Sequence, residues 1–300
     1  MNDALASATA NWHTVRMRTD LSFFASNVSL AAWLYQPETP GPHPLIVLSH
    51  GFSAIMEMGL AHYAEAFTAA GFACLVYNHR NFAGSGGEPR FEIDPWQQVA
   101  DMRDALSFAR TLPNIAPDRI GLWGTSYSGG HALVVAALDR RVRCVVSQVP
   151  LVAGYATLRS WVPEAAWPKL EARFIADRDA RYRGEPPRTT QPAQPGSTTW
   201  AWVEATRSES VYPNEITQRS LELLGSYEPG QFVARIAPTP LLMILATRDE
   251  QTPFATQRVI YDQAGEPKRL VLLDCEHYDP YTSHFAPACA AACEWFKTHL

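Results

Sequence analysis

The feature that most constrains the fold is a regular alternation between short apolar runs and longer amphipathic segments. The runs have the length of buried strands, and the segments between them have the length of helices. Strands separated by helices of about ten or more residues predict an α/β fold, a mostly parallel sheet with helices on both faces. The predicted strands are Val15–Arg18, Val28–Tyr35, Pro44–Ser49, Phe72–Tyr77, Arg119–Trp123, Val142–Val149, Pro240–Ala246 and Arg269–Asp274. The predicted helices are Glu57–Ala70, Pro95–Leu112, Ser128–Leu138, Pro253–Ala264 and His284–His299.

This alternation stops after Pro150 and resumes at Pro240. Residues 151–235 contain no convincing buried strand, and Gly184–Thr199 is too rich in proline to be anything but a loop. We therefore predict that residues 1–300 form a single domain, in which residues 151–235 are a cap or lid insertion over one end of the sheet.

Composition favours a soluble globular protein and argues against several other classes. With 47% apolar and 18% charged residues, the chain can bury a large core. The net charge of −5 gives no electrostatic reason to bind nucleic acid. Apolar runs are far shorter than the roughly 18 residues needed to span a bilayer, and the first residues lack the basic segment of a secretion signal. A cytoplasmic protein without nucleic-acid or membrane partners is expected, and the oligomeric state stays open.

The cysteines predict neither a disulfide framework nor a metal site. Cys74, Cys144 and Cys275 lie in or at the end of strand-like apolar runs, where a thiol usually acts as a small hydrophobe. Cys289 and Cys293 are one helical turn apart, but no further Cys or His completes a ligand set beside them. No metal and no cofactor are expected.

A nucleophile elbow is the strongest chemical signal in the sequence. Gly124–Gly130 reads GTSYSGG and directly follows the predicted strand Arg119–Trp123. An elbow of the G-x-S-x-G type holds Ser126 in a sharp strand-to-helix turn, which requires small residues at positions 124 and 128. Gly124 fits the pattern, and Ser128 replaces the usual glycine with another small residue. The motif alone is weak, because glycine and serine are common in turns.

A serine nucleophile needs an imidazole to take its proton and a carboxylate to orient that imidazole. In this fold the chain order is serine, acid, histidine. His277 follows the strand Arg269–Asp274 at its carboxyl end, where ligands bind to parallel sheets. We therefore predict His277 as the base. His284, at the expected start of the last helix, is the alternative, and His299 lies too near the terminus.

The predicted acid is Asp249, which follows the strand Pro240–Ala246. Glu250 is the alternative, because an error of one residue in this loop would exchange the two. A structural explanation also exists, since carboxylates favour helix starts and Pro253 opens a predicted helix.

Two backbone N–H groups are expected to form an oxyanion hole. Phe52 follows the strand Pro44–Ser49 in a His-Gly-Phe-Ser turn, and Tyr127 follows Ser126. Gly51 allows the backbone to approach the substrate closely. Without the other members of the site, this turn would have no functional meaning.

Several other features are interpreted as structural. The Gly84–Gly87 run lacks the lysine of a phosphate-binding loop. The histidines interpreted as packing or surface residues are His43, His62, His79 and His131. Aromatic residues in the 151–235 segment suit either a core or an apolar substrate wall: Trp161, Trp167, Trp200, Trp202 and Tyr212.

Together these motifs resemble the α/β-hydrolases. They are similar to the dienelactone-hydrolase-like and Xaa-Pro-peptidase-like esterases, a branch that includes fungal polyketide transferases and thiohydrolases. The resemblance covers nearly the whole chain and is weakest in residues 1–12 and 184–200. It implies a serine-hydrolase fold with a Ser-His-Asp triad. Two positions depart from the family pattern, namely Ser128 and Ala246, where a glycine often opens the acid loop.

The expected activity is hydrolysis of carboxylic esters or thioesters of small to medium acyl substrates, with Ser126, His277 and Asp249 as triad and Phe52 and Tyr127 as oxyanion hole. Alternatives with the same triad are an acyltransferase that releases polyketides and a carbon–carbon bond hydrolase. A binding protein that uses the pocket without catalysis is a further alternative, which a complete triad argues against.

Overall fold

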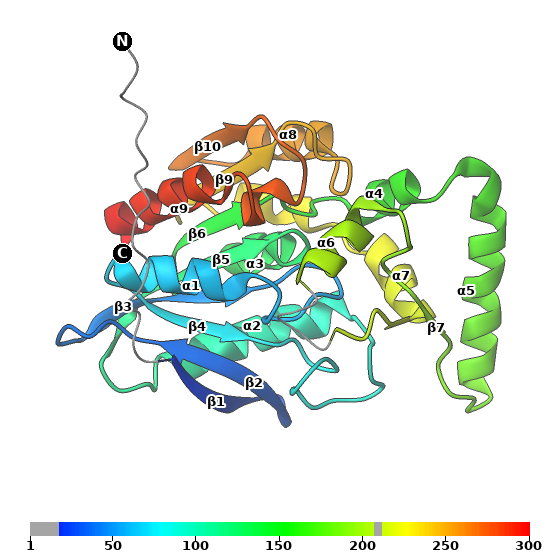
Figure 1. Cartoon of the computed structure of the whole chain (residues 1–300), viewed down its shortest axis with the longest axis horizontal. Coiled ribbons are helices and arrows are strands. Elements are labelled where there is room, and N and C mark those ends of the chain that lie inside the picture. The colour runs from blue at the N-terminus through cyan, green and yellow to red at the C-terminus, as the bar shows by residue number, and fades with distance from the viewer. Residues whose placement is uncertain (1–17, 207–211) are drawn as a thin grey trace, which may run out of the picture.

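The central element of the computed structural model, which describes residues 18–206 and 212–300, is an eight-stranded sheet (Figure 1). Strand β2 is antiparallel to both of its neighbours, and every other neighbouring pair is parallel. The mostly parallel sheet predicted from the sequence is confirmed. In spatial order the strands are β1 (Arg18–Ala25), β2 (Val28–Tyr35), β4 (Ala73–Tyr77), β3 (His43–Ser49), β5 (Ile115–Thr125), β6 (Val142–Gln148), β9 (Leu241–Ala246) and β10 (Lys268–Leu273).

The five predicted helices begin and end within three residues of their predicted positions, whereas α4 to α7 were not predicted. Helix α2 begins where the Asp94 side chain accepts hydrogen bonds from the backbone N–H groups of Trp96 and Gln97, at 3.0 and 3.3 Å. It ends before the predicted Leu112, because Pro113 disfavours helical backbone in the residue that precedes it. The helices are α1 (Leu60–Ala69), α2 (Pro95–Ala109), α3 (Tyr127–Leu138), α4 (Gly154–Trp161), α5 (Trp167–Tyr182), α6 (Thr198–Thr206), α7 (Gln218–Gly225), α8 (Phe254–Gln263) and α9 (Phe285–His299).

Side chains along the central strands alternate between two cores, one on each face of the sheet. On β3, Leu45 and Val47 lie in one core, and Ile46 and Leu48 lie in the other. Successive side chains of a strand point to opposite faces, so a sheet covered on both sides needs an apolar residue at every position. Helices α2, α3 and α8 contribute to the first core, and α1 and α9 contribute to the second. This burial explains why the strands are continuous apolar runs.

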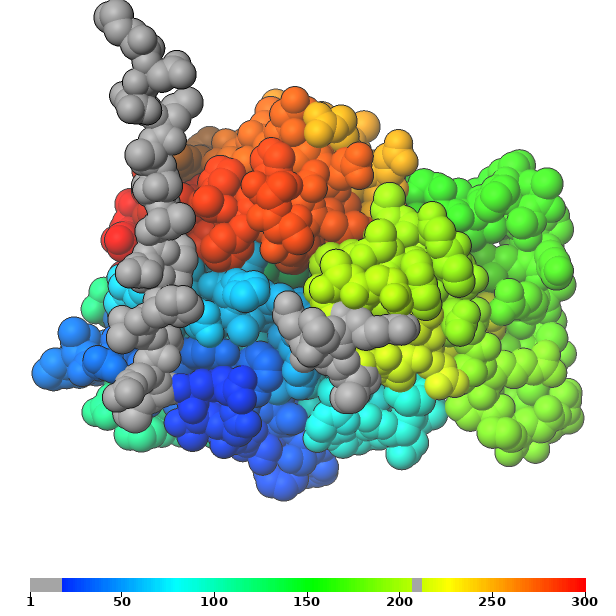
Figure 2. Space-filling view, viewed as in Figure 1, coloured from blue at the N-terminus to red at the C-terminus, as the bar shows by residue number. Residues whose placement is uncertain are grey.

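The chain between β6 and β9 adds helices α4 to α7 and a small hairpin of β7 (Thr189–Thr190) and β8 (Ile216–Thr217). None of its described residues joins the main sheet. Figure 1 shows these helices beyond one end of the sheet, with α5 outermost. In the space-filling view, the green to yellow atoms of this segment form one side of the molecule and abut the orange C-terminal part (Figure 2). Its role as a lid stays a prediction.

The first strand differs from its prediction. Of the predicted range, residues 15–17 lie outside the described residues, and β1 begins at Arg18 and continues to Ala25. This strand is at the edge of the sheet, and its exposed side includes Phe24, which is 75% exposed. A half-exposed edge strand has no continuous apolar run, which is why the sequence pattern did not reveal it. No described helix has the length and apolar character to cross a membrane.

Two paired leucines test the difference between the covered strands and the sheet edge. Leu245 on β9 and Leu272 on β10 are neighbours in register, yet Leu245 is fully buried and Leu272 is 50% exposed. We expect Leu245→Ala to lower the free energy of unfolding by about 2–5 kcal/mol. We expect Leu272→Ala, the matched control, to lower it by less than about 1 kcal/mol. Urea unfolding of both variants measures the difference, and equal losses would contradict the burial described above.

Candidate active site

The turn between β5 and α3 holds Ser126 in a conformation that few non-glycine residues adopt. Its backbone has φ 54° and ψ −120°. The Ser126 N–H donates to the carbonyl of Gln148 at 2.9 Å, and the Ser126 carbonyl accepts from Leu151 N at 2.9 Å. Such strain persists only where the surroundings enforce it. The predicted elbow is therefore present, and it presents the Ser126 side chain to a cavity.

Glycine at position 124 is a steric requirement of this turn. A Cβ atom there would lie 2.1 Å from the Ser128 carbonyl oxygen and 2.9 Å from the Ala132 Cβ. Ser128 itself, the departure from the glycine pattern, is fully buried, and its hydroxyl lies 3.0 Å from the Ser49 hydroxyl. The larger residue is thus accommodated with a polar partner.

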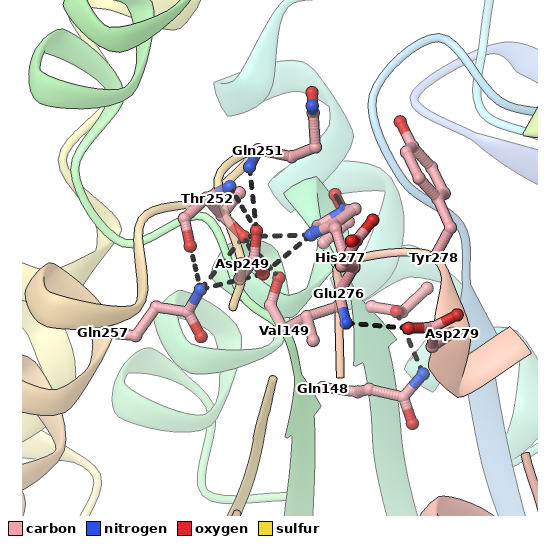
Figure 3. Close-up of polar contacts among 12 residues, drawn as sticks. Gln148, Val149, Asp249, Gln251, Thr252, Gln257, Glu276, His277, Tyr278 and Asp279 are labelled. Atoms are coloured by element: carbon pink, nitrogen blue, oxygen red, sulfur yellow. Dashed lines mark hydrogen bonds and ion pairs between the residues drawn. The ribbon is translucent and has the colours of Figure 1, made fainter. Parts of the chain in front are cut away.

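The structure brings Ser126, His277 and Asp249 into one hydrogen-bonded line. His277 Nε2 lies 3.1 Å from Ser126 Oγ, and His277 Nδ1 lies 2.8 Å from Asp249 Oδ2. Figure 3 shows the imidazole facing the carboxylate. His277 and Asp249 are only 4% and 5% exposed, so water scarcely competes for these bonds. Neither alternative takes part in this line: Glu250 is exposed and lines the cavity, and His284 precedes α9 and shares a hydrogen bond with Ser283.

The Asp249 carboxylate is held by more donors than the sequence suggested. Oδ1 accepts from the N–H groups of Gln251 and Thr252 at 2.9 and 2.8 Å. Oδ2 lies 2.9 Å from Thr252 Oγ1 and 3.2 Å from Gln257 Nε2 (Figure 3). Burial alone would raise the pKa of Asp249, but the His277 imidazole and the Thr252 bonds outweigh it and lower the pKa. The carboxylate therefore stays charged and can orient the imidazole.

Sequence reasoning missed Thr252 and Gln257. The spacing of Asp249 and Thr252 carried a signal, because an aspartate side chain often accepts from N–H groups two and three residues later. Gln257 lies on α8 and gave no such signal, since only the packing of that helix brings its amide to the carboxylate.

The predicted oxyanion donors lie on either side of Ser126. A Cβ on Gly51 would lie 3.1 Å from Ser126 Cβ and 3.3 Å from its Oγ, so the loop of Phe52 passes close to the serine. Tyr127 opens α3, where a helix has no carbonyl to pair with its N–H. In the part of the chain that the structure describes, the Phe52 N–H donates to no protein acceptor. Both N–H groups are therefore available to a bound molecule.

Comparison with known proteins shows the family of the chain. Residues 26–279 match the X-Pro dipeptidyl-peptidase (S15) family. The chain belongs to this family. It is 34% identical over 247 residues to the quorum-quenching protein AidA of Acinetobacter baumannii. The aligned region covers 79% of this chain and 80% of AidA. It is also 32% identical over 256 residues to a thiohydrolase of Eupenicillium brefeldianum, and the aligned region covers 80% of each chain.

The solved structures show the same fold. The α/β hydrolase GrgF from Penicillium sp. sh18 superposes with a TM-score of 0.84 at 25% identity, over 94% of this chain and 99% of that one. The expected resemblance is thus confirmed, and the S15-family protein is a hydrolase with the α/β-hydrolase fold.

A cavity of about 400 Å³ opens onto Ser126 and His277. Of the aromatic residues expected in a substrate wall, Trp161, Trp202 and Tyr212 line it. Trp167 does not, because it packs beneath the Arg159 guanidinium, whose Cζ is 4.3 Å from its ring centroid. Polar residues from the same segment add hydrogen-bonding groups to the wall: Gln191, Gln194, Ser197 and Thr199. The cavity therefore combines aromatic surfaces with uncharged polar groups and the carboxylate of Glu250.

One group of side chains has metal-ligand atoms close together. A sulfur, a carboxylate oxygen and a ring nitrogen of Cys275, Asp279 and His284 lie within 4.8 Å of one another. The Asp279 oxygens already accept from the Glu276 N–H at 2.8 Å and the Ser283 hydroxyl at 3.1 Å. These bonds hold the loop that carries His277.

Replacement of Gly124 tests whether the elbow depends on its close packing. We expect Gly124→Ala to lower the free energy of unfolding by at least about 2 kcal/mol, because the new Cβ meets rigid backbone. Gly86→Ala is the matched control, since its Cβ would lie no closer than 3.4 Å to any neighbour. Thermal denaturation compares the two, and a Gly124→Ala variant as stable as Gly86→Ala would contradict the steric argument.

Proposed function

We propose that this S15-family hydrolase cleaves carboxylic esters or thioesters through an acyl-enzyme on Ser126. The observation that carries the proposal is the line of hydrogen bonds from Ser126 through His277 to Asp249, at 3.1 and 2.8 Å, beside a substrate-sized cavity. A serine hydroxyl becomes an effective nucleophile when an oriented imidazole can take its proton. The similarity to the thiohydrolase of Eupenicillium brefeldianum supports the inclusion of thioesters.

In the first half of the reaction, Ser126 Oγ attacks the substrate carbonyl carbon while His277 Nε2 takes the hydroxyl proton. Asp249 accepts the hydrogen bond of His277 Nδ1–H and stabilises the imidazolium without becoming protonated itself. The carbonyl oxygen becomes an oxyanion, which the N–H groups of Phe52 and Tyr127 stabilise. The intermediate then collapses, and His277 gives its proton to the leaving alkoxide or thiolate.

In the second half, His277 takes a proton from water, and the resulting hydroxide attacks the acyl-enzyme carbonyl. The same two N–H groups stabilise the second oxyanion, and the acid product leaves as Ser126 regains its proton. If an alcohol or amine replaces water in this step, the product is a transacylated molecule. Acyl transfer is therefore the second candidate activity, and it differs from hydrolysis only in the acceptor.

The cavity supports small to medium acyl substrates. Its volume of about 400 Å³ lies in the range of small-molecule sites. Its walls come partly from residues 151–235, including Trp161 and Trp202, so we assign this segment the role of a cap within a single domain. The partner of the protein is then a small acyl ester or thioester, and we place the reaction in the cytoplasm.

Removal of the nucleophile is the direct test. We expect Ser126→Ala to lose at least about a thousandfold of the p-nitrophenyl ester hydrolysis of the wild type. A phosphonate ester should label the wild type at Ser126, as mass spectrometry of its peptides would show, and should leave the variant unlabelled. Ser22→Ala, at an exposed position of β1, is the control and should keep full activity. An active, unlabelled Ser126→Ala would overturn the proposal.

Substrate length tests the contribution of the cap. Trp161 lines the cavity, and its indole N–H donates to the Gln251 carbonyl at 2.8 Å. We expect Trp161→Ala to raise KM for short acyl esters about tenfold, which corresponds to the loss of roughly 50 Å² of apolar contact. We also expect the preferred acyl chain to become longer, because the smaller side chain leaves more room. Trp167→Ala, the matched control outside the cavity wall, should keep the wild-type length profile. Identical profiles for all three proteins would contradict the role assigned to the cap.

A further inference from the structure

Three buried polar side chains meet directly beneath the oxyanion loop, which we define as His50-Gly51-Phe52. Ser128 Oγ lies 3.0 Å from Ser49 Oγ and 2.9 Å from His79 Nε2, and Ser49 Oγ lies 3.1 Å from the same nitrogen. We call these three residues the polar triangle. Ser49 and Ser128 are fully buried and His79 is 2% exposed, so water does not compete for the hydrogen bonds among them.

The polar triangle connects the elements that carry the two oxyanion donors. Ser49 ends β3 and is followed at once by the oxyanion loop, while Ser128 lies in the first turn of α3 beside Tyr127. His79 follows β4, the strand next to β3 in the sheet. The hydroxyl at position 128 thus joins the elbow to Ser49, which directly precedes the oxyanion loop. The glycine of the usual pattern would not make this contact.

A second set of hydrogen bonds reaches the peptide group that contains the Phe52 N–H. The His79 N–H lies 3.4 Å from His50 Nε2, and His50 Nδ1 lies 3.2 Å from the Gly51 carbonyl oxygen. Both contacts are satisfied together when Nδ1 carries the His50 proton. The Gly51 carbonyl and the Phe52 N–H belong to one planar peptide unit, so a bond that orients the carbonyl also orients the N–H.

The surroundings keep these imidazoles uncharged. Burial lowers the pKa of His50 to about 4. Burial, reinforced by the nearby His50 and His131, also holds the pKa of His79 well below its ordinary value. Arg80, whose charge also lowers the pKa of His79, is itself paired with Asp101. A neutral imidazole can donate from one nitrogen and accept at the other, which the two contacts of the His50 ring require.

We propose that His50, His79 and Ser128 are positioning residues that aim the Phe52 N–H at the oxyanion. This inference rests on the proposed function and adds to it the part of the fold that holds the oxyanion hole. The N–H groups of an oxyanion hole act only when they point to the place where charge develops, and small displacements are costly. The departure at Ser128 then has a function, because its hydroxyl couples the two donors.

The test compares two buried serines on either side of the elbow. Ser128→Ala removes the hydroxyl of the polar triangle, and Ser147→Ala removes a fully buried hydroxyl that donates to the Gly129 carbonyl at 3.0 Å. We expect Ser128→Ala to lower kcat by about tenfold to a hundredfold with KM within about twofold. A trifluoromethyl ketone, which forms an oxyanion on Ser126, should bind more weakly by the same factor. Ser147→Ala should keep both values within about twofold of the wild type.

A pair of His79 variants keeps the test decisive if Ser128→Ala does not fold. His79→Gln can place an amide near the position of Nε2, whereas His79→Leu cannot hydrogen-bond, so we expect His79→Gln to retain more kcat and more inhibitor affinity. Wild-type kcat and inhibitor affinity in Ser128→Ala, or equal losses in Ser147→Ala, would overturn the positioning role. The comparison of the wild type with Ser126→Ala tests the proposed function separately. If the wild type hydrolyses no ester, the proposed function is wrong, but the geometry of the oxyanion loop is not contradicted.

Discussion

The site depends on one constraint of the fold, which is that neighbouring parallel strands end at the same edge of the sheet. The loop after β3 carries Phe52, the turn after β5 carries Ser126, and the loops after β9 and β10 carry Asp249 and His277. These strands follow one another in the sheet with only β6 between them. Ser126 and His277, which are 151 positions apart in the sequence, therefore reach hydrogen-bonding distance from short loops at the strand ends.

Two kinds of polar group are buried at this edge of the sheet, and they are stabilised in different charge states. Asp249 is buried but receives hydrogen bonds from backbone and side chains, so its charged form is stabilised. His50 and His79 are buried among neutral partners, so their neutral forms are stabilised. The same low-dielectric surroundings thus favour a charged carboxylate at one place and neutral imidazoles at another, because the available donors and acceptors differ.

The segment between β6 and β9 supplies the aromatic part of the cavity wall that lies outside the sheet edge. It contributes Trp161, Trp202 and Tyr212 to the cavity wall, whereas Ser126 and His277 belong to the sheet edge. Tyr212 also shares a hydrogen bond of 2.9 Å with Ser53, next to the oxyanion loop. In the proposed function, substrate selection and chemistry therefore come from different parts of the chain that meet at one cavity.

The sequence by itself determined the strands and helices outside residues 151–235, the elbow around Ser126 and the positions of Asp249 and His277, but not helices α4 to α7. These follow from local signals: apolar periodicity, the steric need for Gly124, and the order in which strand ends deliver side chains. It missed most of β1, because an exposed edge strand lacks the apolar run that marks a buried one. Only the tertiary structure decided that Gln257 holds Asp249 and that Ser128 meets Ser49 and His79. Those partners lie on separate elements, and the packing of helices against the sheet, which no local pattern encodes, sets the distances between them.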